Sequence, residues 1–219
     1  MNSMINNELD WFQNWYGQCC KIQDEAKCSI TIDTIDNPGW FVTIDIADFS
    51  LAAKPLLKVN REYSEHEWIQ CWVKDAVFYG VGGPGNLPSV LSTFRLWACN
   101  MDYQNVPATS INQLDTDDDF FWLINWRNSQ CNGDWEHSFG VHLTTSTDKP
   151  GWHLKIDVAE TNLERAALEQ ISAWRSNDDW YSYEVKNSVF AGKGGVENLS
   201  DILHGFRAYA KAYKQFNVI

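Results

Sequence analysis

Residues 40–46 read Trp-Phe-Val-Thr-Ile-Asp-Ile, and residues 152–158 read Trp-His-Leu-Lys-Ile-Asp-Val. In both stretches the apolar residues alternate, as in a strand with one buried face, and each stretch follows a Pro-Gly turn. At this offset of 112 residues, residues 40–98 align with residues 152–210 without a gap, and 21 of the 59 pairs are identical. The chain is therefore predicted to be a tandem repeat of two similar units.

Each unit is predicted to run from a helix through four strands to a second helix. The opening helix carries Trp11, Trp15 and Cys19 on one face, and residues 121–128 are its counterpart. In the first unit the strands are predicted at 29–35, 40–46, 68–74 and 76–79. A glycine cluster then precedes the closing helix, for which Asn86 and Asn198 are the predicted N-caps.

This order of elements predicts an α+β fold. We expect two tandem α-β-β-β-β-α units, each an antiparallel sheet with helices packed on one face. The segment 163–175 is predicted to be partly helical. The predicted boundaries are 1–105 for the first unit, 106–119 for an acidic linker and 120–219 for the second. We further expect a monomer whose halves pack as a pseudo-dimer.

Composition limits the classes of partner. The 219 residues include 29 Asp and Glu against 17 Lys and Arg, so the net charge is -12. This charge disfavours nucleic acid and anionic membrane surfaces as partners, and it favours capture of a basic partner. No apolar run approaches the roughly 18 residues of a membrane-spanning helix, and Met1–Asp10 lacks the pattern of a secretion signal, so a cytoplasmic location is expected.

Signals for catalysis or for a bound metal are weak. The six cysteines include no C-x-x-C pair and are interpreted as reduced apolar residues, and no cofactor or metal is expected. A Cys–His enzyme would use Cys131 and His137 with Glu136, but His137 aligns with Glu25, so the pair is not repeated. We therefore expect no enzymatic activity. An enzyme that uses these three residues is the less favoured alternative.

Strand alternation predicts a recognition surface. If Ile69 and Cys71 face the helices, Trp68 and Trp72 face the other way, and the same alternation turns three more side chains outward: Trp180, Asp45 and Asp157. Exposed tryptophan and carboxylate side chains are typical of binding surfaces. The alternatives are that these residues pack the two halves together, or that the tryptophans bind a small ligand such as a carbohydrate.

Two longer motifs carry a resemblance to a known family. Residues 131–140 read Cys-Asn-Gly-Asp-Trp-Glu-His-Ser-Phe-Gly, and residues 32–40 read Ile-Asp-Thr-Ile-Asp-Asn-Pro-Gly-Trp. With the tryptophan-rich helix and the glycine cluster, they resemble the immunity protein 53 family of bacterial polymorphic-toxin systems, here as a fused pair of units. The first unit has Gln23-Asp24-Glu25 in place of the W-E-H motif, and the second has Asp148-Lys149-Pro150-Gly151 at the turn.

The resemblance implies a protein that binds a cognate toxin in the cytoplasm and blocks it. The toxin is expected to be basic, as a nuclease with a groove for nucleic acid would be. The predicted partner-binding residues are Asp134, Trp135, Glu136, His137, Asp45, Asp157, Trp68 and Trp180. The alternative for the W-E-H motif is a loop that folds back to cap the sheet.

Overall fold

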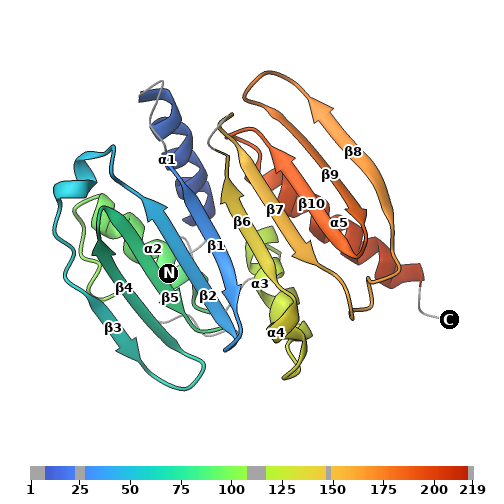
Figure 1. Cartoon of the computed structure of the whole chain (residues 1–219), viewed down its shortest axis with the longest axis horizontal. Coiled ribbons are helices and arrows are strands. Elements are labelled where there is room, and N and C mark those ends of the chain that lie inside the picture. The colour runs from blue at the N-terminus through green and yellow to red at the C-terminus, as the bar shows by residue number, and fades with distance from the viewer. Residues whose placement is uncertain (1–7, 23–27, 108–116, 147–148, 217–219) are drawn as a thin grey trace.

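The computed structural model describes residues 8–22, 28–107, 117–146 and 149–216, which form a single ten-stranded antiparallel sheet with helices on one face (Figure 1). The strand order is β3-β4-β5-β2-β1-β6-β7-β10-β9-β8. The first five strands of this order come from the first unit and the other five from the second, so the predicted α+β tandem is confirmed. The sheets of the two units are continuous, which alternation within each unit could not predict.

The elements repeat in order along the chain. The first unit contains α1 (Glu8–Ile22), β1 (Ile30–Ile35), β2 (Gly39–Asp45), the 3-10 helix η2 (Ser50–Ala53), β3 (Val59–Glu62), β4 (Trp68–Lys74), β5 (Val77–Gly82) and α2 (Leu87–Ala98). The second contains α3 (Asp119–Gln130), α4 (Trp135–Ser138), β6 (Val141–Thr145), β7 (Trp152–Asp157), β8 (Leu168–Trp174), β9 (Trp180–Lys186), β10 (Val189–Gly194) and α5 (Leu199–Phe216).

Each unit has one strand more than the sequence predicts. The prediction of partial helix in 163–175 was wrong, because β8 pairs along β9 as the outer strand of the sheet. Its first-unit counterpart β3 pairs with β4 and was also missed. Because most side chains of β8 are exposed, the segment lacks the alternation that marks a half-buried strand.

The two sheets join at β1 and β6. Ile32 lies opposite Leu143 at the centre of this antiparallel pair, and Asp33 lies opposite His142. The His142 Nδ1 atom contacts the Asp33 carboxylate across the junction. From the junction outward, the strands of one unit follow the same order as their counterparts in the other, so the junction lies on an approximate twofold axis.

The closing helices cover one face of the sheet. Helix α2 packs on β4 and β5, and α5 packs on β9 and β10. A β-carbon added to Gly80 would lie 2.2 Å from Val90 Cγ1, and one added to Gly192 would lie 2.3 Å from Ile202 Cγ2, so glycine allows each helix to approach the sheet.

The predicted N-cap role needs correction for Asn86. Asn86 is at the N-cap position of α2, but no side-chain capping bond to the helix forms. Instead, its Oδ1 atom accepts a hydrogen bond from the Trp68 N–H at 3.0 Å. Asn198 accepts from the Trp180 N–H at 2.9 Å in the same way. These buried amides join the start of a strand to the start of a helix, and the bonds give buried polar atoms a partner.

The opening helix of each unit packs against the other unit. From α1, the Tyr16 hydroxyl accepts a hydrogen bond from the Gly151 N–H at 3.0 Å, and its ring lies 4.7 Å from that of Trp152. From α3, the Arg127 guanidinium donates to the Ile35 carbonyl at 3.2 Å and lies 5.7 Å from the Trp40 ring. The two units are therefore interlocked by helices as well as joined by strands.

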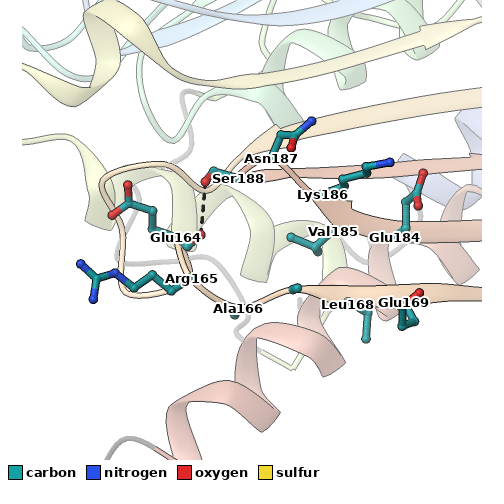
Figure 2. Close-up of a pocket in the computed structure, with 11 residues that line it drawn as sticks. Glu164, Arg165, Ala166, Leu168, Glu169, Glu184, Val185, Lys186, Asn187 and Ser188 are labelled. Atoms are coloured by element: carbon teal, nitrogen blue, oxygen red, sulfur yellow. Dashed lines mark hydrogen bonds between the residues drawn. The ribbon is translucent and has the colours of Figure 1, made fainter.

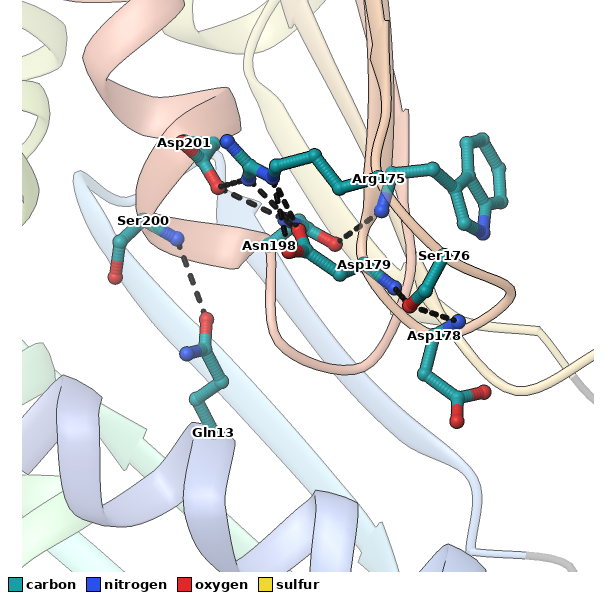
Figure 3. A network of polar contacts seen from close by, with 9 residues as sticks. Gln13, Arg175, Ser176, Asp178, Asp179, Asn198, Ser200 and Asp201 are labelled. Carbon is teal, nitrogen blue, oxygen red and sulfur yellow. Dashed lines mark hydrogen bonds and ion pairs between the residues drawn. The ribbon is translucent and has the colours of Figure 1, made fainter.

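A polar network fixes the start of α5 (Figure 3). Asp179 accepts from Arg175 Nε at 2.8 Å and from Asn198 Nδ2 at 2.8 Å, and Arg175 also reaches Asp201 at 3.1 Å. The hydrogen bond from Arg175, followed by that from Asn198, lowers the pKa of Asp179. Gln13 of α1 accepts from the Ser200 N–H at 3.3 Å, so the opening helix of the first unit also contacts this corner.

Candidate protein-binding surfaces

The W-E-H motif forms α4, and its first two side chains are buried. Trp135 is 2% exposed, its Nε1 atom donates to the Ala159 carbonyl at 2.9 Å, and its ring lies 6.3 Å from that of Trp126. Glu136 is 8% exposed and accepts from the Asn132 N–H at 3.0 Å and the Gly133 N–H at 3.1 Å. Both side chains therefore anchor the segment 131–140, Trp135 to the rest of the second unit and Glu136 to the backbone of the segment itself.

The electrostatics of Glu136 agree with a structural role. Burial tends to raise the pKa of this carboxyl, but the backbone N–H groups of Glu136, Asn132 and Gly133 outweigh burial, and the pKa lies below its usual value. Hydrogen bonds from uncharged donors to a carboxylate stabilise its ionised form, so Glu136 is a fixed negative charge at neutral pH.

The other two members of the motif are accessible. Asp134 and His137 are exposed, and His137 lines a depression of about 460 Å³ between α4 and the end of the β1–β6 junction. This depression also contains polar and charged side chains from α4, from strands β6 and β7 and from the turn after β1: Asp36, Glu136, His142, Lys155 and Asp157. It brings together three of the predicted partner-binding residues, namely Glu136, His137 and Asp157, whereas Asp134 and Trp135 do not line it.

The sheet face opposite the helices holds the other predicted residues. Ile69 and Cys71 are buried, while Trp68 and Trp180 are partly exposed, as alternation predicts. Asp45 is also partly exposed, and its Oδ1 atom accepts from the Ala47 N–H at 2.9 Å. The four residues Asp45, Asp157, Trp68 and Trp180 therefore lie on the same face but on separate strands.

This face also carries three aromatic side chains outside the predicted set, namely Phe41, Tyr79 and Trp174. Phe41 and Tyr79 have ring centroids 6.3 Å apart, and Trp72 stacks on Tyr79 at 5.3 Å. Trp174 is 63% exposed and stacks on Trp180 at 5.7 Å. Alternation along β2 and β5 could have placed Phe41 and Tyr79 on this face, because the neighbours of both residues along the strand point into the core.

A second depression, of about 430 Å³, lies near the outer strand of the second unit (Figure 2). It is lined by residues 164–169 and 184–188, including Glu164, Arg165 and Lys186. Ser188 Oγ donates to the Glu164 carbonyl at 3.2 Å. The hydroxyl thus contacts a backbone oxygen rather than a base that could activate it.

The residues of the minor enzyme alternative do not form an activated pair. Cys131 Sγ contacts the Arg127 carbonyl at 3.5 Å, and burial raises the pKa of this thiol despite the nearby Arg127. A nucleophilic cysteine needs the opposite shift. All six cysteines lie within the described residues and are free thiols there.

The described residues offer neither a metal site nor a membrane-spanning helix. These residues contain no group of three or more His, Cys, Asp or Glu side chains arranged to hold a metal ion. Their helices include none long and apolar enough to cross a membrane. Gln23-Asp24-Glu25 and Asp148, which mark the departures from the motifs, lie outside the described residues, as does 108–116 of the predicted linker.

The geometry defines a class of protein with two interlocked α+β units, one open sheet face and a polar depression beside α4. The family model for immunity protein 53 matches residues 9–99 and residues 120–211. The chain therefore belongs to the immunity protein 53 family and contains two tandem copies of its unit. No curated protein and no solved structure matches the chain.

Proposed function

We propose that the chain neutralises a cognate bacterial toxin by binding its toxic domain in the cytoplasm and blocking the active site. The observation that carries the proposal is the family match to both units, which together cover most of the chain. Neutralisation by binding needs no catalytic group, so the proposed mechanism does not depend on the raised pKa of Cys131 or on a metal.

The charge of the chain supports a basic toxin. With a net charge of -12, the protein attracts cationic surfaces over distances of about a Debye length. A toxin that cuts nucleic acid presents such a surface, because its groove must bind phosphates. Electrostatic attraction would increase the association rate, while buried aromatic contacts would determine how slowly the complex dissociates.

The proposal is tested with the toxin domain encoded beside the protein. Cells that express this domain should survive when the full chain is co-expressed, and the two proteins should purify as a stoichiometric complex. The association rate constant should fall steeply between low and high salt, while the dissociation rate constant changes less. Toxicity that persists despite well-expressed full chain would refute the proposal.

A carbohydrate-binding function has weaker support. The Trp174–Trp180 stack is a suitable shape for a sugar, but Lys149 Nζ lies 4.9 Å and 5.0 Å from the two ring centroids and occupies this position. A sugar would have to displace the lysine and its cation–π contacts. We therefore favour the protein-binding function.

A further inference from the structure

The open sheet faces of the two units differ although their backbones correspond. At the offset of 112 residues, three aromatic side chains of the first unit are replaced by polar or small ones, in the pairs Phe41/His153, Trp72/Glu184 and Tyr79/Ala191. The strand pairing is unchanged, since Trp72 lies opposite Tyr79 just as Glu184 lies opposite Ala191. The difference is therefore in the side chains and not in the fold.

In the first unit these side chains form one aromatic cluster. The rings of Phe41 and Tyr79 are inclined by 28° and those of Tyr79 and Trp72 by 8°, so the three rings stack in a row across strands β2, β5 and β4. All three side chains are partly exposed. The four long helices α1, α2, α3 and α5 lie behind the sheet, and this face is turned toward the viewer in Figure 1.

The second unit indicates that the fold does not require the aromatic cluster. It forms the same strands in the same register with His153, Glu184 and Ala191 at the corresponding positions. Exposed aromatic surface gains little from folding, because water still reaches the rings, and clustered exposed rings favour association. The cluster is thus better explained by a binding role than by stability.

Charges around the aromatic cluster favour a basic partner. Asp33 lies directly opposite Phe41, Asp45 lies opposite Val77, and Glu62 lies opposite Trp68 at the outer edge. Alternation places these three carboxylates on the open face, where Lys74 is a cation at the far end of β4 and His142 contacts Asp33. The rim of the cluster is therefore mainly acidic.

The corresponding face of the second unit is more cationic. Thr43 and Val81 of the first unit correspond to Lys155 and Lys193 of the second. His153 lies between these lysines, and its pKa is lowered by burial and by both of them. A basic partner would be repelled by this surface and attracted to the acidic rim in the first unit.

We propose that the aromatic cluster Phe41–Tyr79–Trp72 is the contact surface for the toxin, and that the second unit supports this surface. The partner is a protein domain with an apolar protrusion flanked by lysine or arginine side chains. The apolar protrusion would cover the rings, and the cations would face Asp33, Asp45 and Glu62. This inference rests on the proposed toxin-neutralising function and assigns that function to one face of one unit.

The test exchanges the cluster for the residues that the second unit already uses. The triple variant Phe41→His, Trp72→Glu, Tyr79→Ala of the full chain is titrated calorimetrically with the toxin domain encoded beside the protein. Its dissociation constant should rise roughly 100-fold or more, since central aromatic side chains dominate such interfaces. Because the new glutamate adds attraction for a basic partner, this expectation is conservative.

A matched control changes the second unit at His153 and Glu184, which correspond to Phe41 and Trp72, and at Lys193, because Ala191 is already alanine. The variant His153→Ala, Glu184→Ala, Lys193→Ala should bind within about threefold of the unchanged chain, because it leaves the aromatic cluster intact. Circular dichroism and the melting temperature establish that both variants are folded. If the triple variant is unfolded, the single variants Trp72→Ala and Tyr79→Ala replace it, with a rise of at least tenfold expected for each.

The outcomes separate the two proposals. If the unchanged chain binds the toxin and the folded cluster variants bind equally well, the contact surface is elsewhere and only this inference is overturned. If the second-unit control loses binding while the cluster variants keep it, the contact surface lies on the second unit and this inference is likewise overturned. If the unchanged chain does not bind the toxin, the proposed function fails, and the inference that rests on it fails too.

Discussion

The contact between Tyr16 and Gly151 provides a direct test of interlocking between the units. Tyr16 is 1% exposed, and its hydroxyl accepts from the buried Gly151 N–H. The variant Tyr16→Phe removes this acceptor and leaves the ring beside Trp152, so packing is preserved. The Gly151 carbonyl keeps the Ser146 N–H as a donor at 3.0 Å, and therefore one backbone group alone becomes unsatisfied.

The expected loss of stability follows from that one group. A buried N–H without an acceptor costs about 1–3 kcal/mol. For a chain of this length, a loss of about 2 kcal/mol lowers the melting temperature by roughly 4–8 °C. Because Tyr16 joins α1 of the first unit to the turn before β7 of the second, both units should unfold in one cooperative transition at the lower temperature.

The assay is urea and thermal denaturation of the full chain, followed by circular dichroism and by tryptophan fluorescence. Tyr63→Phe is the matched control, since Tyr63 is 60% exposed and its variant should change stability by less than about 0.5 kcal/mol. The reasoning is refuted if Tyr16→Phe is as stable as the control. It is also refuted if two transitions separate and only one of them shifts.

Three further predictions concern stability. Glu136→Gln should cost about 1–2 kcal/mol at pH 7, where the carboxylate accepts from the Asn132 and Gly133 N–H groups. This difference in stability should shrink as the pH falls through the lowered pKa of Glu136, because the protonated acid also lacks the charge. Urea titrations at descending pH measure it, and Glu65→Gln, at an exposed position, is the control with an expected change below about 0.5 kcal/mol at pH 7. Trp135→Ala should cost roughly 3–5 kcal/mol through cavity formation, and a smaller loss in the same denaturation assay would show that the site collapses. The fragments 1–105 and 118–219 should each melt below the whole chain in calorimetry; equal melting temperatures would contradict interlocking.

The sequence was sufficient where burial leaves a repeating pattern. Alternation around Trp40 and Trp152 predicted strands β2 and β7, because burial of one face of a strand repeats at every second residue. The exposed strand β8 was not predicted, because its side chains show no alternation of burial. A strand at the edge of a sheet is held mainly by backbone hydrogen bonds, which leave no pattern in the sequence.

The candidate surfaces were predictable only in part. Alternation correctly placed Trp68 and Trp180 on the open face, but the W-E-H motif gave no sign that Trp135 and Glu136 would be buried while His137 remains exposed. Burial of these residues depends on Trp126 and the Ala159 carbonyl, which come from distant parts of the chain. A local motif cannot specify such contacts.

The sequence by itself determined that the chain is a doubled, acidic α+β protein with the motifs of one immunity family in both halves. Tertiary structure alone decided that β1 and β6 join the halves into one sheet and that α1 and α3 each pack against the other unit. The physical reason is that strand pairing across the junction uses backbone groups common to nearly all residues, and the choice of edge depends on which surfaces the helices leave uncovered.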